Sequence, residues 1–191
     1  MPIHSWAMNK LMSDMFDDRT VVISGELSRN TSTAAISQLL LLNATDPDAE
    51  IKLYIDSATG SLPAGFAICD AINCIKPEVS TWAIGTVGSA ATLVLCSGAI
   101  GKRYMLPGSH VVLRQPDHDE GLDGEPVTPT TADHQKWSDE MVQLLVAKTG
   151  QDPDIIARDL RNHLRLSTTD AAPYGIADQV MADGKYAPQG N

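Results

Sequence analysis

Residues 85–116 decide the fold of this chain and read GTVGSAATLVLCSGAIGKRYMLPGSHVVLRQP. Within them Ser89 is flanked by glycine and alanine, and an apolar run typical of a buried helix follows. A sharp turn of small residues at the start of a helix holds a serine hydroxyl clear of the backbone, as a serine nucleophile requires. The stretch ends in an apolar strand that runs into Arg114. A serine nucleophile needs a base, and at this strand end, where we would look for one, the residue is an arginine.

Strands and helices alternate along the chain at the spacing of βαβ units. Such units build a parallel sheet with right-handed crossovers, so the chemistry of an α/β protein collects at the carboxyl ends of the strands. The turn at Thr59-Gly60 and the serine at Ser89 both fall at such ends. The expected strands are 20–24, 51–55, 79–84, 105–106 and 110–113, and the expected helices are 31–43, 64–75, 89 to 98 or 101, 133–148, 153–162 and 167–174.

The stretch from Asp117 to Thr131, DHDEGLDGEPVTPTT, differs from its surroundings. It is acidic and carries Pro126 and Pro129, through which no regular helix runs, so we predict an exposed loop. We expect the whole chain, 1–191, to form a single domain with a disordered tail over 183–191.

The composition excludes several classes of function. The net charge of −10 argues against a nucleic-acid surface, and no apolar run is long enough to cross a membrane. The first residues lack the basic start and apolar stretch of a signal peptide, so we expect a cytoplasmic protein. Cys69, Cys74 and Cys96 lie in apolar segments without metal-ligand spacing, which predicts buried, reduced thiols and no metal or other cofactor.

A series of short motifs occurs in one order along nearly the whole chain. Together they resemble the ClpP family, the proteolytic subunits of the ATP-dependent Clp protease, from about Ser13 to Met181. The motifs are Tyr54-Ile55-Asp56-Ser57, Thr59-Gly60-Ser61, Ala64-Gly65, Ile75-Lys76-Pro77, Gly101-Lys102-Arg103-Tyr104, Leu106-Pro107, Gln115-Pro116, Thr149-Gly150-Gln151, Arg158-Asp159 and Tyr174-Gly175-Ile176.

The resemblance implies a crotonase-like α/β fold, a spiral βαβ core with a protruding handle helix, here in the region of about 117–148. It also implies heptameric rings, commonly stacked in pairs, which dock to a hexameric Clp ATPase and cut peptides with a Ser-His-Asp triad. Carried over residue by residue, the nucleophile position falls on Ser89, and the oxyanion-hole positions fall on Gly60 and Ala90. The histidine position falls on Arg114 and the aspartate position on His163, so two of the three triad members are replaced.

The replacements leave the activity open between two main hypotheses. An arginine side chain stays protonated in proteins and offers only donors, so Arg114 cannot take the serine proton. The first hypothesis is therefore a catalytically impaired subunit, in which Arg114 contacts His163 and fills the site, and which acts through assembly with itself or with an active paralogue. The second is an active peptidase with a rearranged site, which uses Ser89 with His163 or with a base supplied in trans. A third, more remote hypothesis is a crotonase-fold acyl-CoA enzyme.

Three further departures from the family pattern concern partners. The acidic loop takes the place of the glycine-rich approach to the handle helix, so we expect an altered contact between rings. About 18 residues precede the first strand, so most of the axial pore loop is expected to be missing. In the expected ATPase docking pocket Tyr54 is present, but Cys74 stands where a larger ring is usual. We interpret His110 as a surface or interface histidine.

Overall fold

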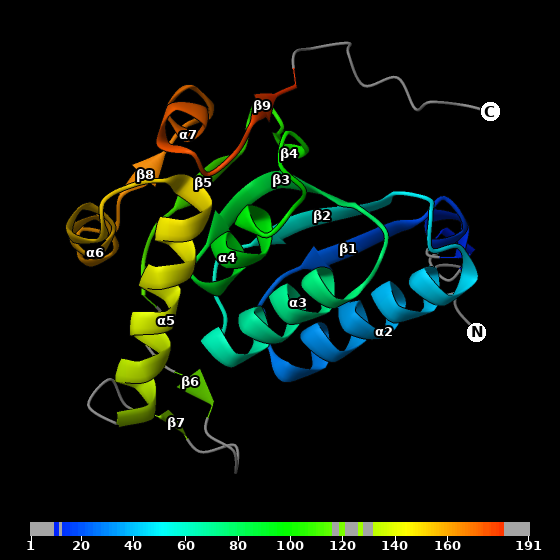
Figure 1. Cartoon of the computed structure of the whole chain (residues 1–191), viewed down its shortest axis with the longest axis horizontal. Helices are drawn as coiled ribbons and strands as arrows, with labels where there is room; N and C mark the ends of the chain where they lie inside the picture. The colour runs from blue at the N-terminus through cyan, green and yellow to red at the C-terminus, as the bar shows by residue number, and fades with distance from the viewer. Residues whose placement is uncertain (1–9, 12, 116–118, 121–125, 128–131, 182–191) are drawn as a thin grey trace, which may run out of the picture.

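The alternation of strands and helices expected from the sequence is present in the computed structural model, which describes residues 10–11, 13–115, 119–120, 126–127 and 132–181 (Figure 1). Five strands lie parallel in the order β1 (Thr20–Ser24), β2 (Ile51–Ser57), β3 (Val79–Gly88), β4 (Arg103–Met105) and β9 (Gln179–Val180). The far end of β3 pairs instead with β5 (His110–Val112), which pairs antiparallel with β8 (Arg165–Leu166). The sheet therefore divides along β3, and the branch through β5 leads to the candidate site.

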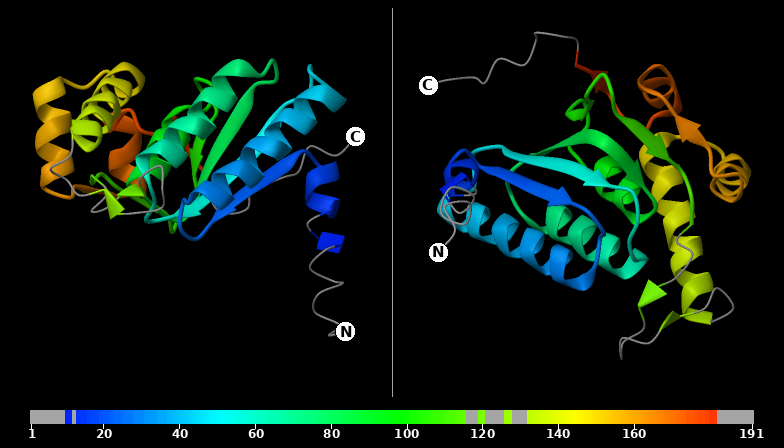
Figure 2. Two further views of the ribbon diagram at one scale, coloured as in Figure 1. Left: turned by 90° about the horizontal axis from the view of Figure 1, so that it is seen from below. Right: turned by 180° about the vertical axis from the view of Figure 1, so that it is seen from behind.

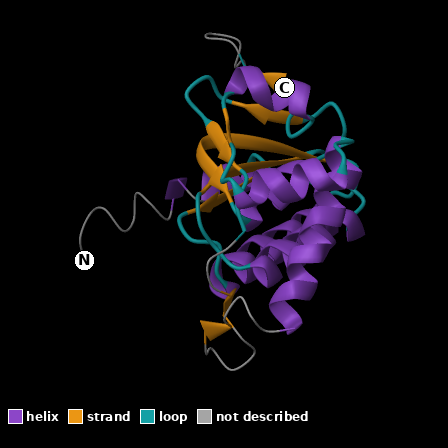
Figure 3. Cartoon of the chain, turned by 90° about the vertical axis from the view of Figure 1, so that its left-hand side faces the viewer, coloured by secondary structure: helices purple, strands orange, loops and turns teal. Residues whose placement is uncertain are grey.

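Helices cover one face of this sheet (Figure 3). Helices α2 (Arg29–Thr45) and α3 (Leu62–Cys74) lie side by side, and the short α4 (Ala90–Cys96) is buried at every position (Figures 1 and 2). Helix α2 begins two residues earlier than expected because Ser28, in extended backbone, caps it. The Ser28 hydroxyl accepts a hydrogen bond from the Thr31 amide, and the Ser28 amide donates one to the Thr31 hydroxyl.

The C-terminal part begins with α5 (Ala132–Thr149), whose start after the prolines agrees with the expected interruption of the handle region. The buried side chains of Met141 and Leu145 anchor its second half. Helix α6 (Pro153–Arg161) is capped by Asp152, and α7 (Thr168–Tyr174) ends at Gly175 in the left-handed region, both as expected. Most of the acidic segment lies outside the described residues, and its described parts form a short antiparallel ladder, β6 (Asp119–Glu120) with β7 (Pro126–Val127). The predicted tail over 183–191 also lies outside them.

Strand β3 runs four residues beyond its predicted end at Ile84. The register with β2 shifts just after Ala83, where Gly85 adopts a φ of +61°. A Cβ on Gly85 would lie 2.6 Å from the Asp56 carboxylate, which accepts a hydrogen bond of 3.2 Å from the Thr86 amide. The sequence prediction treated Gly85 as the end of the strand, whereas it forms a bulge that carries the chain on to Ser89.

Two of the three cysteines are buried, as expected, but Cys74 is exposed. Cys74 lies on the exposed side of α3, next to Asn73 and one helical turn after Asp70, so the expectation of three buried thiols was wrong for this residue. Burial raises the pKa of Cys69 to about 11 and that of Cys96 to about 12, so both thiols stay protonated at neutral pH.

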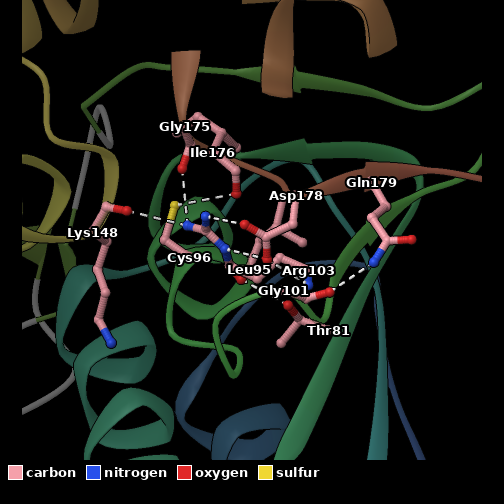
Figure 4. A network of polar contacts seen from close by, with 10 residues as sticks. All are labelled: Thr81, Leu95, Cys96, Gly101, Arg103, Lys148, Gly175, Ile176, Asp178 and Gln179. Atoms are coloured by element: carbon pink, nitrogen blue, oxygen red, sulfur yellow. Dashed lines mark hydrogen bonds and ion pairs between the residues drawn. The ribbon is translucent and has the colours of Figure 1, made fainter. Parts of the chain in front are cut away.

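A buried ion pair fastens the C-terminal elements to the sheet (Figure 4). The Arg103 guanidinium donates to both carboxylate oxygens of Asp178 at 3.0 and 2.5 Å, and to the carbonyl oxygens of Gly175 at 2.9 Å and Lys148 at 3.2 Å. These bonds join β4 to the end of α5, the end of α7 and the approach to β9. Burial opposes ionisation of Asp178, but the hydrogen bonds from Arg103 outweigh it and hold the pKa of the carboxyl below its usual value.

Among the described residues, no helix has the length and apolar character that crossing a membrane requires.

Candidate active site

The predicted elbow is present at Ser89, which links the end of β3 to the start of α4. Ser89 has φ 51° and ψ −131°, a backbone conformation that residues other than glycine rarely adopt. The preceding Gly88 packs so closely on the turn after β2 that a Cβ there would lie 2.8 Å from the Ala58 carbonyl oxygen, and 3.4 Å from the Val112 carbonyl oxygen of β5. Backbone on both sides of Gly88 therefore holds the turn that carries the serine.

The Ser89 side chain is completely buried, and its hydroxyl donates to the carbonyl oxygen of Gly60 at 3.4 Å. A peptide carbonyl accepts a hydrogen bond but is far too weak a base to take the proton at neutral pH. Within the described part of the chain, no side chain forms a hydrogen bond with this hydroxyl. The serine thus sits at the elbow, and no described side chain is hydrogen-bonded to it as a base.

The two predicted oxyanion-hole positions lie next to this serine. Gly60 has φ +149°, and a Cβ there would lie 2.4 Å from that of Leu27, so only glycine fits. Ala90 is the first residue of α4 and follows Ser89 directly. No described residue accepts a hydrogen bond from the amide of Gly60 or of Ala90. Both amides are therefore available as donors, as an oxyanion hole requires, although their role stays a prediction.

Arg114 and His163 are far apart in the sequence, but strand pairing brings their chain segments together. Strands β5 and β8 pair antiparallel with Val112 opposite Arg165, and the Leu113 amide donates to the Leu164 carbonyl oxygen at 2.8 Å. Arg114 follows Leu113, and His163 precedes Leu164 in a turn, so the two residues flank this hydrogen bond. Their assignment as the positions of the base and its orienting acid stays a prediction.

The side chains of these two residues differ in their surroundings. The Arg114 guanidinium donates to the Ala58 carbonyl oxygen at 3.4 Å, in the same turn whose Gly60 holds the Ser89 hydroxyl. His163 is exposed and has φ 52°. Among the described residues, no hydrogen bond joins the His163 side chain to Arg114 or to Ser89. The expected contact between Arg114 and His163 therefore stays a prediction.

The sequence analysis missed a neighbouring polar cluster. His110 Nε2 lies 2.9 Å from the Thr86 hydroxyl and also accepts a hydrogen bond from the Arg165 guanidinium. The even spacing of His110 and Arg114 along one strand was the available signal, because it places both on the same face. Thr86 and Arg165 gave no signal, since only the folded sheet brings them to this place.

Comparison with known proteins agrees with this geometry. The family model described as Clp protease matches residues 4–184.

The chain belongs to the Clp protease family.

Its structure is also similar to that of the ClpP protease catalytic domain from Plasmodium falciparum, with a TM-score of 0.83 and 29% sequence identity over 96% of each chain. The resemblance drawn from the motifs and the α/β fold of ClpP are both confirmed. The roles assigned to Ser89, Gly60, Ala90, Arg114 and His163 are not tested by these similarities and stay predictions. No group of three or more His, Cys, Asp or Glu residues among the described ones is arranged to hold a metal ion.

Proposed function

We propose that this chain is a Clp protease subunit with an impaired peptidase site, which acts through ring assembly with itself or with an active paralogue. The observation that carries the proposal is the hydrogen bond from the Ser89 hydroxyl to the Gly60 carbonyl, with the Arg114 guanidinium at the same turn. A serine peptidase needs an imidazole at this place, whereas Arg114 supplies only N–H donors. Loss of the base and its orienting acid leaves only the acceleration that substrate binding and oxyanion stabilisation provide, roughly 10³-fold over water.

The alternative is an active endopeptidase that uses Ser89 with His163 as its base. One observation favours it: His163 is exposed, and it lies across the β5–β8 pair from the residue that stands in the base position. For His163 to reach Ser89, the Arg114 side chain has to leave the Ala58 turn. The observed hydrogen bonds support the impaired subunit instead.

We base our proposals for the assembly and partners of this chain on its membership of the Clp protease family. We expect a heptameric ring, single or stacked, or a mixed ring with an active paralogue, working on peptides in the cytoplasm. A Clp ATPase is a further expected partner, although its docking surface differs from the usual pattern. Tyr54 stacks on Trp82 with ring centroids 5.4 Å apart, Trp82 stacks on Tyr104 at 4.2 Å, and a cavity of about 880 Å³ lies beside Tyr54. Cys74 contributes no ring there.

Labelling with a fluorophosphonate probe tests the impaired site directly. An impaired subunit stays unlabelled under conditions in which an active ClpP control is labelled. Labelling that disappears in Ser89→Ala would show that a base still activates the serine, and the alternative would then replace the proposal. An additional His163→Asn variant, which retains a residue tolerant of a left-handed backbone, identifies the base if labelling is seen.

A further inference from the structure

Four basic side chains lie on the β5–β8 pair or next to it, and we call them the basic ribbon: His110, Arg114, His163 and Arg165. Alternate residues of a strand share a face, so His110 and Arg114 point the same way from β5 and its extension. The register of Val112 with Arg165 places Arg165 on this face, and His163 lies in the turn two residues before Arg165. This local concentration of basic groups contrasts with the chain's overall charge of −10.

The charge of the basic ribbon is not neutralised at Arg165. The partner of the Arg165 guanidinium is His110 Nε2, to which it donates a hydrogen bond. Arg165 is exposed, and no carboxylate of the described residues lies within 4.0 Å of it. His163 is also exposed, and no described residue forms an ion pair with it. Both side chains therefore offer donors to a ligand from solvent.

The basic ribbon ends at the candidate active site. The Arg114 guanidinium reaches the turn that holds the Ser89 hydroxyl, and the Gly60 amide of that turn donates to no described residue. Where the Clp protease pattern has an imidazole and a carboxylate, this chain has the guanidinium of Arg114 and the imidazole of His163. Planar guanidinium groups match a carboxylate, which accepts two parallel hydrogen bonds.

We propose that the basic ribbon binds the carboxylate groups of peptides. The inference rests on the proposed function as a Clp protease subunit, because a protease complex handles polypeptide and its cleavage products. A carboxylate can come from an acidic side chain or from the free C-terminus that cleavage creates. Both sources present the same group to Arg165 and His163.

Three peptides of equal length, each with a charge-neutral fluorophore at the N-terminus, test the proposal by fluorescence anisotropy on the full chain in its native assembly. The first contains glutamates and has an amidated C-terminus, the second has glutamine at those positions and is amidated, and the third has glutamine with a free C-terminus. We expect the first or the third to bind roughly tenfold more tightly than the second, which corresponds to one charge-assisted hydrogen-bonded pair. The peptide that gains affinity identifies the source of the carboxylate. Equal binding of all three peptides would overturn the proposal.

Substitutions then place the binding on the basic ribbon. Arg165→Gln combined with His163→Asn removes both exposed donors, and asparagine tolerates the φ of 52° at position 163. We expect this variant to lose the roughly tenfold preference, while Arg29→Gln, which removes an exposed arginine from the start of α2, keeps it. An unchanged preference in the folded double variant would contradict the assignment. Fluorophosphonate labelling in the same samples separates the two hypotheses, because a labelled serine with intact carboxylate preference refutes only the impaired subunit.

Discussion

Arg114 stands where a serine peptidase needs a base, so the missing chemistry can be supplied by two substitutions. We predict that Arg114→His with His163→Asp raises the hydrolysis of a fluorogenic peptide at least roughly 100-fold over the unmodified chain. The imidazole then takes the serine proton, and the carboxylate across the β5–β8 pair orients it. Adding Ser89→Ala to the double variant should abolish the gain in hydrolysis. Arg161→His, which introduces a histidine at an exposed position of α6, should produce no gain. A folded but inactive double variant would mean a further defect, in the Asp117–Thr131 segment or at the Thr59-Gly60 turn.

Gly88 is needed for the elbow because the turn after β2 leaves no room for a side chain. A Cβ at this position would lie 2.8 Å from the Ala58 carbonyl oxygen, which belongs to the backbone and cannot swing away. We predict that Gly88→Ala lowers the free energy of unfolding by about 1–3 kcal/mol, measured by urea denaturation. Gly108→Ala is the matched control, since no atom lies within 4 Å of its added Cβ, and it should change stability by less than about 0.5 kcal/mol. Equal stability of the two variants would mean that the turn relaxes freely.

At the scale of elements, local sequence patterns predicted those parts of the fold that local interactions determine. The helices from α2 to α7 and the strand β1 follow from apolar periodicity, caps and breakers close to them in sequence. Strands β8 and β9 are two residues long each, and only their partners β5 and β4 make them strands. The extension of β3 depends on the Asp56 carboxylate, 29 residues before Gly85, and so escaped the prediction.

The candidate site divides in the same way. The elbow at Ser89 was predictable from its small neighbours, and the pairing of position 114 with position 163 came from the family resemblance. The cluster of Thr86, His110 and Arg165 was not predicted, because strand pairing assembles it from three separate segments. The sequence therefore predicted the candidate triad positions, but it did not predict the polar residues that surround them.

The Arg103–Asp178 pair should contribute strongly to stability because both partners are largely withdrawn from water. The side chain of Arg103 is 9% exposed and that of Asp178 17%. We predict that Arg103→Met lowers the free energy of unfolding by about 3 kcal/mol or more, since it leaves a poorly solvated carboxylate without its partner. Lys76→Met, which removes an exposed ion pair with Asp48, should cost less than about 1 kcal/mol. Similar losses of unfolding free energy for both variants in urea denaturation would show that the buried pair contributes no more to stability than an exposed one.

The same pair predicts a dependence of stability on pH. The hydrogen bonds from Arg103 outweigh the cost of burial and lower the pKa of Asp178 in the folded protein below its usual value of 3.8. The resulting stabilisation is therefore fully present above that value and is lost as the pH falls through the lower pKa of the folded state. We predict that the difference in unfolding free energy between the unmodified chain and Asp178→Asn is largest near neutral pH and shrinks at strongly acidic pH. A difference that grows on acidification would contradict this assignment.

At the scale of the whole molecule, the described part of the chain leaves an apolar surface uncovered. The cavity of about 880 Å³ lies along the edge strand β1 and is lined by Val22, Ala34 and Tyr54 among others. On α2, Leu40 and Leu41 are 50% and 55% exposed, and Leu41 lies about one helical turn from Gln38, which also lines the cavity. Two neighbouring exposed leucines on one helix are typical of a contact between subunits.

We therefore predict that the purified chain is an oligomer and that Leu40→Glu with Leu41→Glu dissociates it, as measured by native mass spectrometry and light scattering. Two carboxylates on this surface would have to be buried without partners in the contact, which is strongly unfavourable. Ile100→Glu makes the same kind of change at a side chain that is 94% exposed in the turn after α4, and it should leave the oligomer intact. Dissociation by Ile100→Glu alone would move the contact away from α2. If the purified chain is a monomer and also fails to join a ring with an active ClpP paralogue, the proposed function through assembly is refuted. Such a subunit would have neither an active site nor an assembly in which to act.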